Sequence, residues 1–182
     1  MKNILEIIGN TPIVKLQKIV PRGCGEIYLK LEAYNPTGSK KDRMALAMIE
    51  GAEKRGDLKK GMTVVEYSGG STGAGLAFVC SLKGYRFRLI TADVFGKEKI
   101  SLMNSLGADL EVIKSRDGKI TKELINKMIN RAKEISKEPN TFFTNQLDNE
   151  DVIKGFVPLG EEILDQINGS IDAVCDTVGT AG

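Results

Sequence analysis

Residues 63–92, TVVEYSGGSTGAGLAFVCSLKGYRFRLITA, carry the pattern that decides the fold. The β-branched run at 63–68 predicts a strand, and a glycine-rich turn leads from it into an apolar helix at 74–84, which ends at Gly84. Residues 86–92 predict the next strand. Two strands joined by one helical segment are typical of a parallel βαβ unit, so this stretch indicates an α/β protein.

The same alternation continues on both sides of this unit. Further strands are expected at 26–32, 110–115, 141–145 and 172–179, and further helices at about 40–55, 97–106, 121–137 and 149–167. Strands separated by helices in this way predict a doubly wound parallel sheet with helices on both faces.

Composition limits the possible functions. The chain has 182 residues, of which 41% are hydrophobic, enough for one ordinary domain or two small lobes. Lys and Arg total 26 against 24 Asp and Glu, and the net charge of +2 argues against a nucleic-acid or membrane-surface partner. No apolar run approaches the roughly 18 residues of a membrane span, and the start MKNILEIIGNTP lacks a signal-like apolar core. We therefore expect a cytoplasmic protein.

Cysteine and histidine usage restricts the chemistry further. Cys24, Cys80 and Cys175 are odd in number and far apart, so neither a disulfide framework nor a zinc site is expected, and no metal is predicted. The chain contains no histidine, which excludes Ser-His-Asp triads, Cys-His pairs and HExxH sites. Catalysis would have to use lysine, carboxylates, hydroxyls or a cofactor.

Two glycine-rich turns follow predicted strands, SGGSTGAG at 68–75 and VGTAG at 178–182. Glycines let backbone N–H groups converge, and the following helix N-terminus favours a phosphate or carboxylate. Neither turn contains the GK[ST] of a P-loop, and the first reads GxxGxG rather than GxGxxG. A tight βα connection explains either turn alone, whereas the two together favour a site for an anionic ligand.

The stretch NPTGSKKDR at 35–43 precedes the apolar run MALAMI. Ser39 and Asp42 have the spacing of a capping box, so Ser39 is expected to cap the helix. Lys40 and Lys41 then fall in the first helical turn, where the helix dipole disfavours positive charge.

These two lysines have two interpretations. Solvent-exposed lysines at this place would be unremarkable. If the helix is buried on most faces, however, a lysine there must be paired or neutral. A neutral lysine beside an anion-binding turn suggests a carbonyl cofactor held as a Schiff base. Helical periodicity does not choose between Lys40 and Lys41, because both faces look buried.

Six ordered stretches together resemble the cysteine synthase and cystathionine β-synthase family, the β-family of fold type II pyridoxal-phosphate enzymes. They are EIIGNTPIVKL, NPTGSKKDRMALAMIEGAEKRG, GMTVVEYSGGSTGAGLA, SLGADLEV, TNQLDN and DAVCDTVGTAG. The resemblance implies a two-lobed enzyme that is truncated in its larger lobe. Residues 1–34 and 146–182 would form the incomplete large lobe, and residues 35–145 the smaller lobe with the cofactor lysine and the substrate loop.

The resemblance also implies residue roles. Lys41 would be the catalytic lysine that holds pyridoxal 5'-phosphate, with Lys40 as an exposed neighbour, and Asn35 and Ser39 would brace their turn. The implied substrate-binding residues are Ser68, Gly69, Gly70, Thr72 and Gln146, and the implied further cofactor-binding residues are Ser71, Gly179, Thr180 and Gly182.

The implied reaction is β-replacement on an activated serine, of the O-acetylserine type, in which a sulfur nucleophile gives L-cysteine. The released amine of Lys41 would take the α-proton. Ser71 stands where the family usually has asparagine, Gly69 replaces a serine and Tyr67 a proline, so a sibling reaction of the cystathionine β-synthase type stays open, with a serine or threonine dehydratase less expected. Another alternative is an inactive fragment, or one half of a split protein, because the chain ends within the VGTAG turn. The family implies a homodimer when complete.

Overall fold

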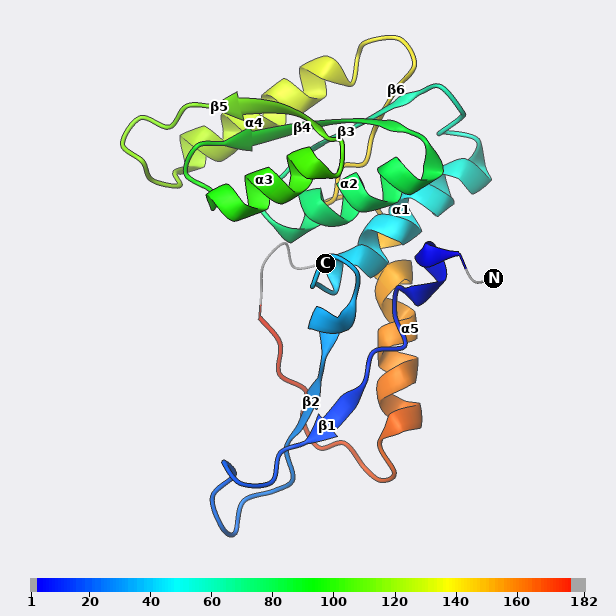
Figure 1. Ribbon diagram of the computed structural model, residues 1–182, viewed down its shortest axis with the longest axis vertical. Coiled ribbons are helices and arrows are strands. Elements are labelled where there is room, and N and C mark those ends of the chain that lie inside the picture. The colour runs from blue at the N-terminus through cyan, green and yellow to red at the C-terminus, as the bar shows by residue number, and fades with distance from the viewer. Residues whose placement is uncertain (1–2, 178–182) are drawn as a thin grey trace.

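The computed structural model describes residues 3–177, and the larger of its two sheets is a four-stranded parallel sheet in the upper part of the view in Figure 1. The strands are β3 (Thr63–Tyr67), β4 (Arg86–Ala92), β5 (Asp109–Ile113) and β6 (Thr141–Phe143), in the order β5-β4-β3-β6. The chain builds the sheet from β3 outward to β5 and then returns to the other side of β3. This reversal confirms the predicted doubly wound α/β fold.

Helices cover both faces of the sheet because apolar residues occupy consecutive positions of the buried strands. Val64 packs into the cluster with α1 (Lys41–Arg55), α2 (Ser71–Lys83) and α3 (Lys97–Ser105), whereas its neighbour Val65 packs against α4 (Lys122–Ile135) on the opposite face. Strands buried on both faces are typical of parallel sheets.

Small residues bring α1 close to two other helices. A Cβ on Gly75 of α2 would lie 3.0 Å from the carbonyl oxygen of Lys41. A Cβ on Gly155 of α5 (Asp151–Gln166) would lie 2.9 Å from the carbonyl oxygen of Arg43. The first turn of α1 is therefore fixed between α2 and α5 by backbone-level contacts, and this sets the place of the lysine pair.

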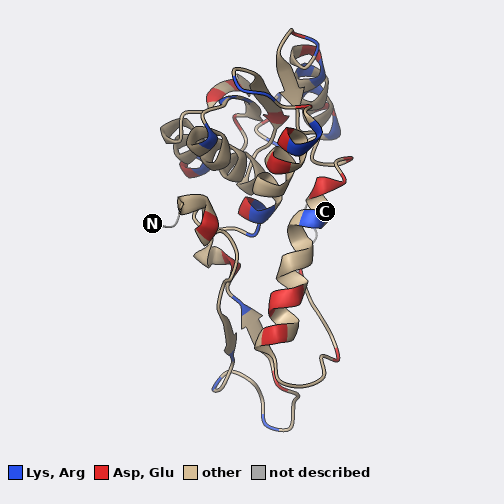
Figure 2. Cartoon of the chain, turned by 90° about the vertical axis from the view of Figure 1, so that its right-hand side faces the viewer, with Lys and Arg blue, Asp and Glu red and all other residues tan. Residues whose placement is uncertain are grey.

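The N-terminal segment forms an arm that extends away from the sheet beside α5 (Figure 1, Figure 2). It contains the 3-10 helices η1 (Ile4–Ile7) and η2 (Glu32–Tyr34) and an antiparallel pair, β1 (Ile13–Lys15) with β2 (Tyr28–Lys30). In Figure 2, acidic residues colour the part of α5 that runs beside this arm.

A buried ion network joins the arm to α1 and α5. The guanidinium of Arg43 donates to Glu32 over 2.8 Å and to Glu162 over 2.6 Å, and Lys30 donates to Glu162 over 2.6 Å. Only 4% of the Arg43 side chain is exposed. These hydrogen bonds hold the pKa of Glu162 at about 2, although burial acts in the opposite sense. The network supplies the partners without which a buried arginine would be strongly destabilising.

Three expectations about secondary structure need correction. Residues 172–177 form no strand, because no described strand lies beside them to pair with. The strand expected at 26–32 is only β2, and its partner β1 was not foreseen because three residues give too little alternation. Helix α2 begins at Ser71, within the glycine-rich turn rather than after it.

None of the helices described is long and apolar enough to cross a membrane. The division into lobes at 1–34 with 146–182 and at 35–145 stays a prediction.

Candidate functional site

The site is positioned by the reversal of strand order between β3 and β6. Ligands of doubly wound sheets bind at the carboxyl ends of the strands where the order reverses, because the adjacent loops diverge there. The loop Ser68–Thr72 follows β3, and Gln146 comes three residues after the end of β6. The ladder continues past β6, since the N–H of Thr144 donates to Val65 O over 3.1 Å. The fold thus brings two sequence-predicted substrate segments side by side.

The hydroxyl of Ser68 shapes the glycine-rich loop. Its Oγ accepts hydrogen bonds of 3.1 Å from the N–H groups of both Gly70 and Gly73. Gly70 is the N-cap of α2 and has no capping side chain of its own, so Ser68 supplies the acceptor for the helix start. Ser68 is buried and can still donate its own proton. Its first role is therefore structural, and contact with a substrate stays a prediction.

Gly69 lies directly under an aromatic ring. A Cβ on Gly69 would stand 2.1 Å from Cε1 of Phe95, so any side chain there would overlap the ring. Phe95 follows β4 and also packs on the cluster around Val65 and Tyr67. The sequence reasoning missed Phe95. The sequence could have indicated Phe95 by its position just after a strand, because the carboxyl ends of parallel strands share the edge of the sheet where the loop lies.

The side chain of Gln146 is almost wholly buried, and only one of its two polar atoms has a hydrogen-bond partner among the residues described. Its Nε2 donates to Tyr67 O over 3.0 Å, which identifies the other side-chain atom as the acceptor. That Oε1 has no hydrogen-bond partner among the residues described. A buried polar atom without a partner costs stability, so it marks a position where a ligand can bind.

Glu66 is a further buried group that the sequence reasoning missed. Its carboxylate accepts hydrogen bonds from Tyr67 N over 2.8 Å, Thr144 Oγ1 over 2.7 Å and Gln146 N over 2.9 Å. The part of the chain described here gives it no cationic partner, and burial raises its pKa to about 7. The sequence could have indicated Glu66, because a carboxylate in an otherwise apolar strand just before the loop is unusual. Glu66 ties the β3 loop to Gln146.

Lys41 is the first residue of α1, and the expected capping box is wrong. The N-cap is Lys40, and the Oγ of Ser39 accepts from Lys41 N over 3.2 Å. Asp42 instead accepts hydrogen bonds from Thr37, through its N–H over 2.7 Å and through its hydroxyl. The carboxylate of Asp42 therefore connects the turn at Thr37 to the start of the helix.

Asn35 braces the same turn from the other side. Its Nδ2 donates to Glu32 O over 2.9 Å, and its Oδ1 accepts from Gly9 N over 2.8 Å. Asn35 is buried, so both bonds replace water and fix the segment that leads to the lysines.

The amine of Lys41 lies in a partly buried environment. Its Nζ is 3.7 Å from Met44 Sδ and 5.5 Å from the centre of the Phe156 ring. Burial lowers the pKa of Lys41, the positive charge of Lys40 lowers it further, and the carboxylate of Asp176 acts in the opposite sense. A lowered pKa increases the neutral fraction of the amine near neutrality, as a nucleophilic lysine requires.

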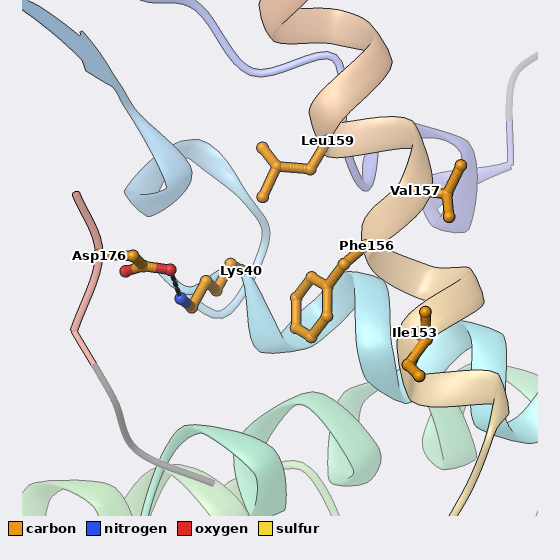
Figure 3. A pocket seen from close by; sticks show the side chains of 6 residues that line it. All are labelled: Lys40, Ile153, Phe156, Val157, Leu159 and Asp176. Carbon is orange, nitrogen blue, oxygen red and sulfur yellow. Dashed lines mark hydrogen bonds and ion pairs between the residues drawn. The ribbon is translucent and has the colours of Figure 1, made fainter. Parts of the chain in front are cut away.

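Lys40 is not the exposed neighbour that was expected. Its side chain is 22% exposed, forms an ion pair with Asp176 and lines a pocket of about 380 Å³ (Figure 3). The other lining residues are Ile153, Phe156, Val157 and Leu159, all on α5. The apolar wall of α5 and the Asp176 segment enclose Lys40, and neither could be foreseen from residues 35–43.

Two further residues of the loop lie at the start of α2. Ser71 is its first residue and is half-buried, and Thr72 is buried. The predicted phosphate-binding residues Gly179, Thr180 and Gly182 lie outside the described residues. Residues 3–177 hold no group of three or more Cys, Asp or Glu residues that could bind a metal ion.

Comparison with known proteins places this geometry in a wider group. The family model of pyridoxal-phosphate dependent enzymes matches residues 4–182. A cysteine synthase of Staphylococcus aureus is 41% identical over 184 residues, covering 99% of this chain and 57% of that protein. The chain thus spans little more than half the length of the curated relatives it matches.

Solved structures agree with this match. A cysteine synthase of Entamoeba histolytica superimposes with a TM-score of 0.88 at 30% identity, covering all of this chain and 54% of that one. A hydrogen sulfide-producing enzyme of Fusobacterium nucleatum gives 0.79 at 38% identity, covering 91% of this chain and 52% of that one.

Proposed function

Because this chain belongs to the family of pyridoxal-phosphate-dependent enzymes, we propose that it forms the lysine-bearing part of an enzyme that makes L-cysteine from an activated serine. The observation that carries the proposal is the position of Lys41 at the start of α1, where its amine lies partly buried beside Phe156 and its backbone carbonyl packs against Gly75 of α2. The cysteine synthases that resemble this chain support the reaction.

The described residues fit the cofactor. Lys41 has a lowered pKa, so its amine is available to hold a carbonyl compound. Ser68 accepts the N–H groups of Gly70 and Gly73, and the other N–H groups in the first turn of α2 are available to an anionic ligand. Pyridoxal phosphate, when bound, supplies an electron-poor ring that stabilises negative charge at the substrate α-carbon. Ser71 is proposed to contact the ring oxygen, and Gly179, Thr180 and Gly182 the phosphate.

Lys41 has two proposed tasks. Its Nζ holds the cofactor before the substrate arrives, and the same Nζ, once released, takes the α-proton as a general base. A base near neutrality needs a pKa well below the usual value of about 10.4. Burial and the charge of Lys40 act in that direction.

The substrate carboxylate is proposed to bind at the loop Ser68–Thr72 and at Gln146. Backbone N–H groups at the start of α2 favour a negative charge. The Nε2 of Gln146 has a second hydrogen beyond the one given to Tyr67 O, and its Oε1 can accept from a donor on the ligand. Glu66 keeps Gln146 beside the loop by accepting its N–H.

A second candidate is a sibling reaction of the cystathionine β-synthase type. The observation in its favour is the Phe95 ring over Gly69. The ring occupies the space that a side chain at position 69 would take, so this part of the substrate loop has an apolar wall. A different wall changes which substrate or nucleophile fits. A cytoplasmic location and a homodimer of the complete protein stay predictions.

The test uses the purified 182-residue chain with pyridoxal phosphate. Borohydride reduction followed by peptide mapping should place a pyridoxyl group on Lys41. Incubation with O-acetylserine and sulfide should then give L-cysteine, whereas serine with homocysteine tests the sibling reaction. Absence of label at every lysine would overturn the cofactor assignment. Label without turnover would favour the alternatives of an inactive fragment or one half of a split protein.

A further inference from the structure

The hydroxyl of Thr144 lies between two oxygen acceptors at the carboxyl end of β3. Its Oγ1 is 2.7 Å from Oε2 of Glu66 and 3.3 Å from the carbonyl oxygen of Val65. A hydroxyl carries one proton, so it serves only one of these acceptors well at a time. If Oε2 carried a proton of its own, it would donate to Thr144 Oγ1, and the hydroxyl would turn to Val65 O. The arrangement therefore offers a hydrogen-bonded position for one further proton on Glu66.

The surroundings of Glu66 bring its neutral and ionised forms close in free energy. The side chain is fully buried, which disfavours the charge, whereas the N–H groups of Tyr67 and Gln146 and the hydroxyl of Thr144 favour it. Among the residues described, burial and these hydrogen bonds are the influences that place the pKa of Glu66 at about 7. Tyr67 is its titratable neighbour on β3, and Asp148, after β6, acts on Tyr67. Both charge states of Glu66 are therefore accessible near neutral pH.

Glu66 also lies directly beside the proposed site for the substrate carboxylate. Its Oε2 accepts from Gln146 N over 2.9 Å, and Ser68, the first residue of the loop, comes two residues after it. The Nε2 of Gln146 donates to Tyr67 O, and its buried Oε1 has no partner among the residues described. A carboxylate bound at this place brings a second negative charge close to Glu66. Like charges in a buried environment disfavour each other, so the ligand favours the protonated form of Glu66.

We propose that Glu66 is a positioning residue that takes up one proton from solvent when a carboxylate binds at the loop Ser68–Thr72 and Gln146. The neutral carboxyl still accepts the N–H of Gln146, so Gln146 stays beside the loop, while the new proton is donated to Thr144 Oγ1. The inference rests on the proposed function, because the carboxylate site is part of it. It makes ligand binding stronger at the pH values where the proton is available.

The first test follows the charge of Glu66 directly in the wild-type chain. The carboxyl carbon of Glu66 is assigned by NMR in the 182-residue chain labelled with ¹³C and ¹⁵N, and its signal is titrated without cofactor. Sodium acetate, compared with sodium chloride at the same ionic strength, should raise the pKa of Glu66 from about 7 by about one pH unit. Acetamide, which has a similar shape and no charge, should leave it in place. The same pKa in acetate and in chloride would overturn the proposal.

The second test measures the same linkage from the side of the ligand. The dissociation constant of acetate, followed by the amide signals of Gly69–Thr72, should rise about fivefold from pH 6 to pH 8, because the ionised Glu66 opposes binding. Glu66→Gln cannot ionise and should bind acetate equally at both pH values. Glu161→Gln changes an exposed carboxylate of α5 and should keep the wild-type dependence. A dependence retained in Glu66→Gln, or acetate that moves none of these signals, would overturn the proposal. If Glu66→Gln does not fold, the titration of the wild-type chain decides.

A cofactor experiment distinguishes this inference from the proposed function. Borohydride reduction with pyridoxal phosphate should label Lys41 in the wild-type chain and in Glu66→Gln. Proton-linked binding of acetate without label at any lysine would refute the cofactor assignment and leave the role of Glu66 intact. Label at Lys41 together with binding of acetate that does not depend on pH would refute the role of Glu66 and leave the cofactor assignment intact.

Discussion

The carboxylate of Glu66 at the end of β3 accepts a 2.9 Å hydrogen bond from the backbone N–H of Gln146, which lies 80 residues further along the chain. One buried side chain thus fixes the distance between the two segments that flank the reversal of strand order. The loop after β3 and the residue after β6 cannot move apart without exposing or breaking this bond.

Glu66 should make stability depend on pH. Its pKa is raised from 4.5 to about 7 in the folded chain, so the folded state binds more protons than the unfolded state between these values. The free energy of unfolding should therefore fall as pH rises through this range, by at most on the order of 3 kcal/mol. Urea unfolding from pH 5 to pH 8 measures the slope.

Glu66→Gln should flatten this slope, because the amide cannot ionise. Glu98→Gln, at an exposed carboxylate, should leave the slope as in the wild-type chain. The prediction fails if the slopes of Glu66→Gln and the wild-type chain coincide.

Gly69→Ser should destabilise the substrate loop. The new Cβ would stand 2.1 Å from the ring of Phe95, and overpacking of this kind typically costs about 1–3 kcal/mol. Phe95→Ala opens the same space, so the double variant should lose less stability than the sum of the two single losses. Thermal unfolding of the wild-type chain, the two single variants and the double variant measures the four stabilities of this double-mutant cycle. Additive losses would mean that the two residues do not compete for one space.

Lys41→Ala should abolish the visible absorbance that pyridoxal phosphate gains on binding to a lysine, because the amine that holds it is gone. Lys40→Ala keeps Lys41 and should keep the absorbance. A titration of each variant with the cofactor measures the difference. The opposite result would transfer the assignment to Lys40.

Glu162 should contribute to stability above acidic pH. Its pKa is lowered from 4.5 to about 2 by Arg43 and Lys30, so its contribution is complete above about 4.5 and disappears as pH falls towards 2. The expected loss is on the order of 3 kcal/mol, and it should be absent from Glu162→Gln. Glu161→Gln changes the exposed neighbour and is the matched control. Acid unfolding curves of the three proteins provide the measurement, and a similar acid transition in Glu162→Gln would contradict the assignment.

Local sequence patterns were sufficient for the order of elements. The run at 63–92 predicted β3, α2 and β4, because β-branched alternation, a glycine turn and a glycine cap act within a few residues. Lys41 does lie at the start of a helix as expected, although the capping box from which that position was predicted is wrong. The same local patterns gave wrong predictions where an element forms only beside a distant segment of the chain. Residues 172–177 have strand-like composition, yet a strand forms only beside another strand.

The sequence by itself determined that this is a doubly wound α/β chain with a lysine pair and a glycine-rich loop, since periodicity and turn chemistry are local properties. Only the tertiary structure decided that Glu66 would join the loop to Gln146, that Phe95 would cover Gly69, and that Asp176 would pair with Lys40. Hydrophobic patterning specifies which face of an element is buried and leaves open what lies against it. The identity of each contact depends on which distant segment the packed helices and the sheet bring to that face.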